Sequence, residues 1–483
     1  MRLLSLLLLT FCFSIGTAFA QTEQTSETLS KRIDTYFSNG VENGFSGQVY
    51  VMRSGETLIN QGYGYANKEA GIPNSAQTVF DIGSNTKQFT AAAILILVEQ
   101  GKVSLKDPLS LYFDDLPEDK QSITVHQLLT HTSGLVETVG SDFDGVTKSE
   151  FFEKVYKSEL LDSPGAAYSY SNIGYSLLAQ IIEKAAGISY ESFLQESFFR
   201  PLGMDQTGYL LPNWKQQDLA VGYYNGVMDI GTMIGRYQES NEVSWNLLGN
   251  GGINATQNDM MLWLGALQKS KVLSADSYDL LTSTYASMGS SDYYYGYGWV
   301  VKQTEELGKR ISHSGSNGVF WHSIIWYPEQ DIQILYVTNA SNLKVERLAG
   351  FIEKMVFDSS YSPDPIAMNV YTYIQKFIEN KPISDSPELL QSLQSDYADE
   401  FDHPRVLNRM GNLLLNSGNN SDWAVELFKL NVSIYPEDGN LWDSLAYGYL
   451  AINKKEDAIE AFRKAISLGY SDAQEKLDEL LNN

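Results

Sequence analysis

Residues 80–98 read FDIGSNTKQFTAAAILILV, a short polar segment that runs into a long apolar one. The apolar part has the length and composition of a buried helix, which Gly101 would end. Ser84 stands at the N-terminal end of this helix and Lys87 follows three residues later, so a hydroxyl and an amine share one helix face. The helix N-terminus favours negative charge on the serine oxygen, and a desolvated lysine can accept the hydroxyl proton. The stretch therefore predicts an activated serine nucleophile at Ser84.

The Ser-x-x-Lys pattern is weak evidence when it stands alone. It arises by chance about once or twice in a chain of this composition, and Ser341 with Lys344 forms a second instance. An isolated pattern is equally consistent with a helix cap followed by a solvated lysine. Ser84 differs from Ser341 because residues 80–83 lead into it and a long apolar helix follows it.

Two further elements follow downstream. Tyr170 and Asn172 form a Tyr-x-Asn element before the helical run 174–186, and residues 313–315 read His-Ser-Gly where the chain opens onto a strand. Each has a structural alternative, an ordinary turn capped by Asn172 in the first case and a structural histidine in the second. The three elements come in the order Ser-x-x-Lys, Tyr-x-Asn, His-x-Gly.

With these elements in this order, the sequence resembles the class C β-lactamase and D,D-peptidase family of penicillin-recognising serine hydrolases, over about residues 30–355. Four more segments resemble the same family: LLTHTSGL at 128–135, PLGM at 201–204, GGI at 251–253 and YGYGW at 295–299. Together they are more specific than any single motif. The resemblance implies an acyl-enzyme serine hydrolase.

The resemblance also implies a role for each motif residue. Ser84 would be the nucleophile, with Lys87 and Tyr170 as the proton-transfer pair. Substrate would be bound by Asn172, by His313 and Gly315 on the opposite wall, and by an oxyanion hole formed from the N–H groups of Ser84 and Ser316. His131, within residues 128–135, is expected to be structural, because the serine already has an amine partner. The sequence contains no Gly-x-Ser-x-Gly, which argues against an α/β-hydrolase nucleophile elbow.

The third motif departs from the β-lactamases, which typically carry Lys-Thr-Gly where this chain has His-Ser-Gly. The His-x-Gly form is more similar to certain D,D-carboxypeptidases and D-amino-acid peptidases, which puts β-lactam turnover in doubt. An unperturbed histidine titrates near pH 6.5. We therefore expect His313 to face the substrate and to give the acylation rate an ionisation between about pH 5.5 and 7.5.

The N-terminus and the composition indicate an exported protein. Residues 1–20 have a basic residue, an apolar stretch and an Ala-x-Ala site, which predicts a signal peptide and a periplasmic or secreted location. The single cysteine, Cys12, lies inside this segment, and the histidines show no metal-ligand spacing, so we expect no metal and no cofactor. A formal net charge of −25 makes nucleic acid and membrane surfaces poor partners.

The chain is long enough for two domains. A hairpin from Ser46 to Tyr65 and three later strand-like runs predict an α+β hydrolase domain, in which one antiparallel sheet is flanked by helices. The later runs are residues 296–302, 319–327 and 332–337. A polar, turn-rich segment after Phe357 predicts the boundary of this domain, which would cover residues 21–357.

An all-α domain is expected at the C-terminus. Residues 358–385 would form a linker and helix, and residues 386–483 tetratricopeptide-like repeats, because Ala424 and Phe428 recur as Ala458 and Phe462 at a spacing of thirty-four residues. A generic helical tail is the alternative. Such repeats offer a surface for a protein partner.

The sequence thus predicts a serine hydrolase that acts on peptide, D-amino-acid amide, ester or β-lactam carbonyls through an acyl-enzyme at Ser84. Two alternatives stay open: a catalytically quiet scaffold that recruits a partner through its helical repeats, and a cell-wall-binding module without turnover. The intact triple motif favours the enzyme.

Overall fold

The computed structural model describes residues 26–289, 292–341, 344–418 and 420–482. The predicted signal peptide lies outside these ranges. The chain divides into two compact units, of which unit 2 comprises Asn225–Met228 and Ala367–Asn483 and unit 1 the remainder.

Unit 1 extends past the predicted boundary at Phe357 and includes residues 358–366. Two contacts explain this, since Asn43 Nδ2 donates a hydrogen bond to the carbonyl of Ile366 at 2.7 Å and the Arg32 guanidinium donates to the carbonyl of Tyr361. Polar, turn-rich sequence therefore follows the surface of unit 1 instead of serving as a free linker.

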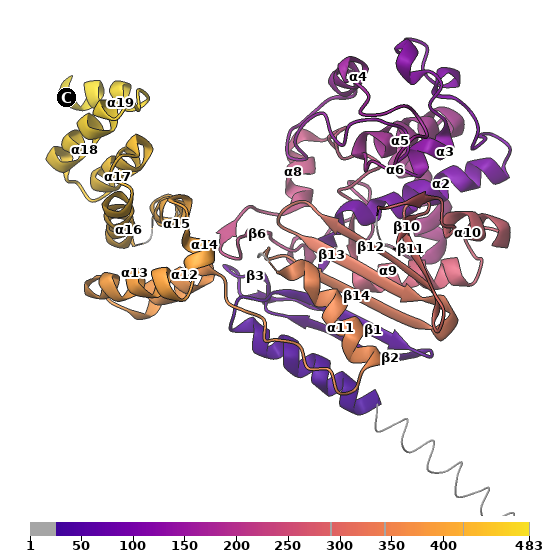
Figure 1. The fold of residues 1–483 in the computed structure, drawn as a ribbon, viewed down its shortest axis with the longest axis horizontal. Helices are drawn as coiled ribbons and strands as arrows, with labels where there is room; N and C mark the ends of the chain where they lie inside the picture. The colour runs from indigo at the N-terminus through magenta and orange to yellow at the C-terminus, as the bar shows by residue number, and fades with distance from the viewer. Residues whose placement is uncertain (1–25, 290–291, 342–343, 419, 483) are drawn as a thin grey trace, which may run out of the picture. The chain divides into compact units, whose positions relative to one another are not determined.

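An eight-stranded antiparallel sheet forms the centre of unit 1 (Figure 1), with the strand order β2-β1-β14-β13-β12-β11-β10-β9. Its strands are β1 Gly47–Arg53, β2 Glu56–Tyr63, β9 Ala286–Ser287, β10 Tyr294–Tyr295, β11 Val300–Thr304, β12 Gly308–Ser316, β13 Trp321–Tyr327 and β14 Ile332–Thr338. The first two strands are the predicted hairpin, and β1 pairs with β14 so that Gly47 lies opposite Thr338. The predicted α+β class is confirmed.

Strand β12 was missed in the sequence because its residues, GKRISHSGS, contain a single aliphatic side chain, Ile311. The expected place of the His-Ser-Gly motif is where the chain opens onto a strand, but residues 313–315 lie near the C-terminal end of β12. The mostly polar strand is held by pairing with β11 and β13 on its two sides. Backbone pairing here overrides a weak local preference for strand structure.

One face of the sheet packs against α2 (Thr86–Glu99) and α5 (Asn172–Ala186), which contact each other. Helix α2 is the predicted buried helix, and most of its side chains are inaccessible to solvent. Tyr50, Ile324 and Leu335 of the sheet share one hydrophobic core with residues of both helices. The N-terminal end of α2 is thereby fixed against the sheet.

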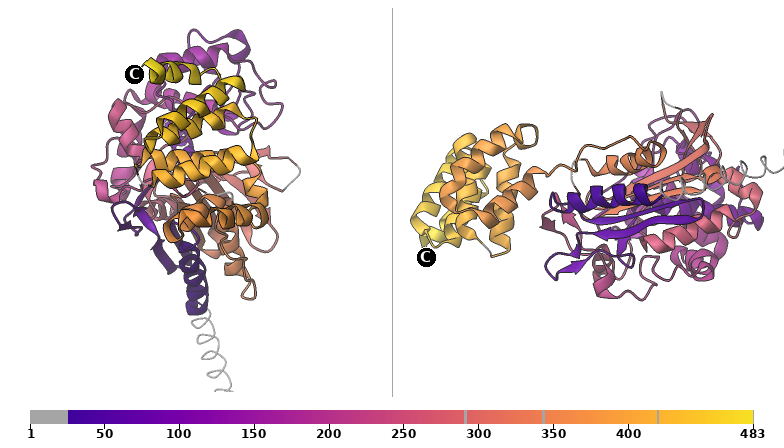
Figure 2. Two further views of the ribbon diagram at one scale, coloured as in Figure 1. Left: turned by 90° about the vertical axis from the view of Figure 1, so that its left-hand side faces the viewer. Right: turned by 90° about the horizontal axis from the view of Figure 1, so that it is seen from below.

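The opposite face packs against the N-terminal helix, residues 26–41, and against α11 (Leu348–Phe357), as Figures 1 and 2 show. Val49 and Val51 of β1 point to this side while Tyr50 points to the other, the alternation expected of a strand buried on both faces.

Unit 2 is helical throughout its described residues beyond Ala367, with short connections. Its helices are α12 Val370–Asn380, α13 Ser386–Ser395, α14 Ala398–Phe401, α15 Arg405–Asn416, α16 Ser421–Ile434, α17 Gly439–Ala451, α18 Lys455–Ser467 and α19 Ala473–Asn482. Helices adjacent in sequence from α15 to α19 pack on each other. Phe428 and Phe462, which carry the thirty-four-residue spacing, are both fully buried. The tetratricopeptide assignment stays a prediction.

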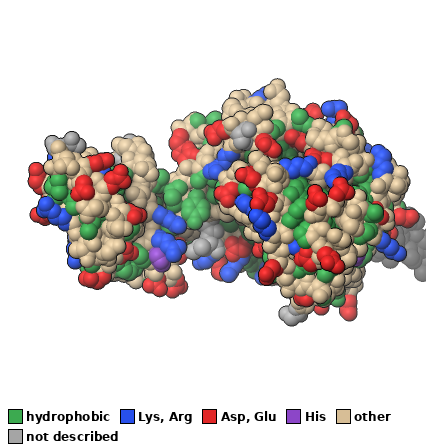
Figure 3. Space-filling view, turned by 90° about the horizontal axis from the view of Figure 1, so that it is seen from above, with side chains coloured by type: hydrophobic (Ala, Val, Ile, Leu, Met, Phe, Trp, Pro, Cys, Tyr) green, Lys and Arg blue, Asp and Glu red, His purple; other side chains and the backbone are tan. Residues whose placement is uncertain are grey.

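Acidic and basic side chains are interspersed over the face of the molecule shown in Figure 3. Within the part of the chain that the structure describes, no helix is long and apolar enough to cross a membrane.

Candidate active site

Ser84 lies in a single 3-10 turn, Gly83–Asn85, that leads directly into α2. Gly83 has a φ of +51°, a left-handed conformation that glycine adopts without steric cost. The carboxylate of Asp81 accepts a hydrogen bond from the N–H of Gly83 at 2.6 Å and so fixes the turn. Ser84 is partly exposed in a run of buried residues, and its hydroxyl is therefore accessible to a substrate.

Lys87 is fully buried one helical turn after Ser84. Its Nζ lies 3.1 Å from Ser84 Oγ, 2.8 Å from Asn172 Oδ1 and 2.7 Å from the carbonyl oxygen of Asn250. The two carbonyl-type oxygens can only accept, so Nζ donates a hydrogen to each. A neutral amine has two hydrogens and one lone pair, and the lone pair then remains for the proton of the Ser84 hydroxyl. The three contacts together place a proton acceptor beside Ser84.

The electrostatic surroundings of Lys87 favour this neutral form. Burial lowers the pKa of the Lys87 ammonium well below its usual range, and the carboxylates of Asp142 and Glu137 oppose the shift to a smaller extent. The free-energy cost of desolvating the buried ammonium exceeds its attraction to these two carboxylates, because the carboxylates are themselves partly or fully solvated. Lys87 is therefore suited to act as a base at lower pH than an ordinary lysine.

Tyr170 precedes α5, and its ring lies 4.8 Å from Lys87 Nζ, measured to the ring centre. Burial raises the pKa of its hydroxyl, and a hydrogen bond with Ser84 acts in the opposite direction. The hydroxyl is consequently protonated at neutral pH and is a proton donor in that state. Lys87 and Tyr170 therefore contact the same serine with complementary protonation states.

The structure places Asn172 beside Lys87. The side-chain oxygen of Asn172 accepts a hydrogen bond from Lys87 Nζ. The sequence did not identify Asn250, because its contribution is a backbone carbonyl, which carries no residue-type signal. Its side chain is held in turn by Ser176 Oγ and the carbonyl of Asn246, at 2.9 and 2.6 Å. The only hint in the sequence was the adjacent segment 251–253.

The end of β12 packs directly against the turn that carries Ser84. A Cβ atom on Gly315 would lie 2.0 Å from the carbonyl oxygen of Ile82 and 2.6 Å from the amide nitrogen of Ser84, and one on Gly83 would lie 2.5 Å from the nitrogen of Ser316. These close approaches bring together the two amides expected to form the oxyanion hole. Ser316 is exposed on β12.

Replacing Gly315 with alanine is expected to abolish acylation of the protein by an active-site probe. The added methyl group cannot move away from the backbone atoms it meets, so strand and turn must separate and the two amides diverge. Labelling by a fluorescent penicillin or a fluorophosphonate checks this. Gly265→Ala in α9 (Gln257–Gln268), where the methyl group meets nothing within 4 Å, is the control and should label like the parent. Normal labelling of the Gly315 variant would contradict the packing.

His313 does not behave as the sequence suggested. It is only 6% exposed, its Nε2 lies 2.9 Å from Tyr295 Oη, and its Nδ1 lies 2.6 Å from the carbonyl oxygen of Ser314. The carbonyl can only accept, so Nδ1 carries the proton and Nε2 accepts from Tyr295. Burial and the nearby Lys87 lower the pKa of His313 to about 3. The expected ionisation of this residue between pH 5.5 and 7.5 is therefore wrong, because its ring nitrogens are occupied inside the protein.

Replacing His313 with glutamine should leave the shape of the acylation pH profile between 5.5 and 7.5 unchanged. A group with a pKa near 3 is already neutral over this whole interval, so its removal deletes no titration. Acylation rates measured at half-unit pH steps check the prediction. The disappearance of an ionisation near pH 6.5 in the variant would show that His313 does titrate there.

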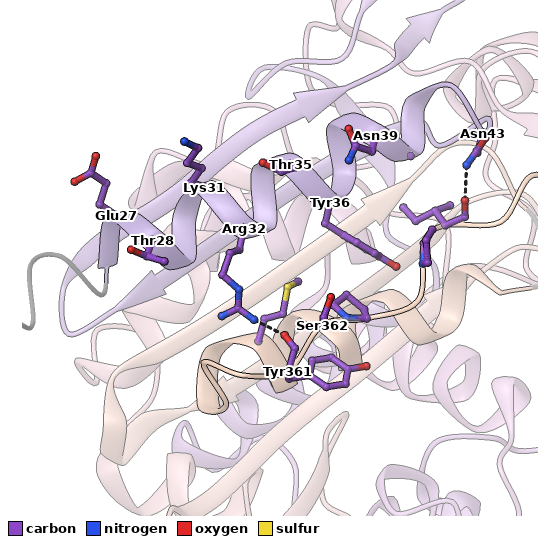
Figure 4. Close-up of a pocket in the computed structure, with 15 residues that line it drawn as sticks. Glu27, Thr28, Lys31, Arg32, Thr35, Tyr36, Asn39, Asn43, Tyr361 and Ser362 are labelled. Carbon is purple, nitrogen blue, oxygen red and sulfur yellow. Dashed lines mark hydrogen bonds between the residues drawn. The ribbon is translucent and has the colours of Figure 1, made fainter.

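A separate cavity of about 730 Å³ lies between the N-terminal helix, residues 26–41, and residues 361–366 (Figure 4). Arg32 and Asn43 bridge its two walls by hydrogen bonds to the backbone. None of the residues that contact Ser84 lines it, so it is distinct from the candidate active site.

Comparisons with known proteins agree with this arrangement. Residues 33–353 match the family model described as Beta-lactamase. The chain is 28% identical over 324 residues to Penicillin-binding protein 4* of Bacillus subtilis (strain 168), which covers 64% of this chain and 71% of that protein. The octameric penicillin-binding protein homologue from Pyrococcus abyssi superposes with a TM-score of 0.60 at 25% identity, over 72% of this chain and 81% of that one. A class C beta-lactamase shares the fold, with a TM-score of 0.59 at 21% identity, over 71% and 97% of the two chains.

Proposed function

The chain belongs to the beta-lactamase family of serine hydrolases, and from this premise we propose that it cleaves amide or ester bonds by acyl transfer to Ser84. The observation that carries the proposal is the set of three contacts around Lys87 Nζ. In the neutral amine, the two hydrogens are donated to the oxygens of Asn172 and Asn250, and the lone pair is left facing Ser84 Oγ.

The first half-reaction follows from these contacts. Ser84 Oγ gives its proton to Lys87 Nζ and forms a bond to the substrate carbonyl carbon. The resulting oxyanion lies toward the amides of Ser84 and Ser316, donors whose loss typically costs about a hundred- to a thousandfold in rate. The bond to the leaving group then breaks as the leaving group takes a proton from Tyr170, which regains one from Lys87. An ester at Ser84 and a neutral leaving group result.

The second half-reaction reverses these roles. A water molecule gives a proton to the Lys87 and Tyr170 pair and attacks the ester carbonyl. The carboxylic acid leaves as Ser84 recovers its proton, so the pair returns to its starting state.

The neutral His313 bears on substrate choice. Where a lysine in the third motif would present a cation to a substrate carboxylate, this ring makes both its hydrogen bonds within the protein. We therefore expect esters and amides without a carboxylate next to the scissile bond to be better substrates than β-lactams.

A matched substrate panel tests the function. Purified protein is given chromogenic esters and D-amino-acid anilides, each with and without a carboxylate on the leaving group, and a chromogenic β-lactam. Turnover of the compounds without a carboxylate, absent with Ser84→Ala, is the expected result. Tight binding without turnover of any compound would favour the scaffold or cell-wall-binding alternative.

We also propose that the protein is exported, to the periplasm or outside the cell, on the strength of residues 1–20. For unit 2 we propose a protein-binding role.

A further inference from the structure

His131 forms hydrogen bonds with the backbone on both sides of Tyr170. Its carbonyl oxygen accepts a hydrogen bond from the N–H of Ser169 at 2.8 Å, and its Nδ1 accepts one from the N–H of Ser171 at 3.0 Å. Tyr170 lies between these two amides in sequence. A single residue thus fixes the backbone at the positions immediately before and after the tyrosine.

The ring of His131 also contacts the ring of Tyr170 directly. The two ring centres are 4.2 Å apart with the planes inclined by 38°. On other sides His131 meets Tyr295 at 4.5 Å and Tyr175 at 5.1 Å, so its ring is enclosed by aromatic side chains and is inaccessible to solvent. Backbone and ring of Tyr170 are therefore both positioned by His131.

The hydrogen bond to Ser171 defines the state of the histidine. Nδ1 accepts from an N–H, so the ring is neutral and its proton lies on Nε2. Burial, followed by the proximity of Lys87 and His313, lowers the pKa of His131 well below its usual range, which agrees with a neutral ring. Among the described residues Nε2 has no hydrogen-bond partner, which is unfavourable for a buried donor.

His131 also has an unusual backbone conformation, with a φ of +56°. Non-glycine residues adopt this region uncommonly, and asparagine, aspartate and histidine are enriched among those that do. The conformation lets one residue present its carbonyl and its ring nitrogen to the same short segment.

We infer that His131 is a positioning residue, which holds the Tyr170 hydroxyl at Ser84 through the amides of Ser169 and Ser171 and through ring contact. The inference rests on the proposed function for its kinetic consequence, but the positioning itself is a property of the fold. His131 is not itself the base, because Nδ1 is occupied by Ser171 and Lys87 already lies at Ser84 Oγ.

Two substitutions separate the acceptor from the ring. His131→Phe keeps a ring and removes the acceptor. His131→Asn removes the ring but keeps an acceptor oxygen on Cγ, the atom that bears Nδ1 in histidine, and tolerates the positive φ. We expect the phenylalanine variant to acylate roughly ten- to a hundredfold more slowly, the scale of a misplaced catalytic group, with the substrate dissociation constant little changed. The asparagine variant should recover most of the loss.

A double-mutant cycle with Tyr170→Phe provides the decisive readout. If His131 acts through Tyr170, the double variant His131→Phe/Tyr170→Phe should acylate no more slowly than Tyr170→Phe alone. A double variant whose acylation rate is reduced by the product of the two single-variant losses would overturn the inference. So would a His131→Asn variant that acylates as slowly as His131→Phe.

Hydrogen exchange supplies a test that does not depend on catalysis. The amide of Ser171 should exchange slowly in the parent and in His131→Asn, and faster in His131→Phe, while peptides from α2 keep their protection. Equal exchange in all three would overturn the inference. This result is obtainable even if the parent proved to have no hydrolase activity, so a failure of the proposed function and a failure of this inference can be distinguished.

Discussion

Replacing Ser84 with alanine is expected to reduce ester or amide turnover by roughly a millionfold, the scale on which loss of a nucleophile acts in serine hydrolases. The substitution removes one hydroxyl from the partly exposed start of α2, where no side-chain cap depends on it. The fold should therefore persist, which thermal unfolding of the variant checks alongside its kinetics.

The chain supplies its own control for this experiment. Ser341 begins the second Ser-x-x-Lys pattern, so Ser341→Ala changes the same residue type in the same pattern. It should retain parental turnover. Activity that survives in Ser84→Ala and is lost in Ser341→Ala would reverse the assignment.

Replacing Lys87 with methionine should slow acylation by about a hundred- to ten-thousandfold, the usual contribution of positioned proton transfer. Methionine fills the space of the lysine stem but cannot accept the serine proton, and it leaves the oxygens of Asn172 and Asn250 without their donor. Tyr170→Phe should slow acylation on a similar scale, because the leaving group loses its acid.

The pH dependence separates the two roles. Because burial lowers the pKa of Lys87, the amine stays neutral to lower pH than in an ordinary lysine, and acylation should fall when the pH drops through that depressed value and the ammonium forms. Lys87→Met should abolish this acid limb, whereas Tyr170→Phe should keep it. Stopped-flow acylation from pH 4 to 9 makes the comparison.

Lys120 provides a matched control for Lys87. It is also buried, and its Nζ donates to the Asp119 carboxylate and the Ser158 carbonyl, each at 2.7 Å. Lys120→Met should lower stability without slowing acylation per folded molecule. Comparable losses of acylation in both lysine variants would mean that burial of a charge, and not proton transfer, explains the effect.

The catalytic pair on α2 was predictable because the interaction is local. Ser84 and Lys87 are joined by helix geometry alone, and a long apolar run is enough to indicate the helix. The order of the three motifs then indicated that Tyr170 and Asn172 belong to the same site. In the structure both residues lie beside Lys87 Nζ.

Features that depend on tertiary contacts were not predictable. The pKa of His313 is set by burial and by Lys87 from another element, and its ring is bound by Tyr295 of β10. Asn250 acts through a carbonyl, which every residue has. For His131 the sequence indicated a structural residue, but its bonds on either side of Tyr170 follow only from how the loop before α5 folds back.

The most direct test of the account is the site of covalent modification in the intact protein. The full chain is incubated with a fluorophosphonate, digested, and mapped by tandem mass spectrometry. We expect one adduct per chain, on the Oγ of Ser84, with the adduct lost in Lys87→Met at short reaction times. A stoichiometric adduct on any other serine, with Ser84 unmodified, would contradict it.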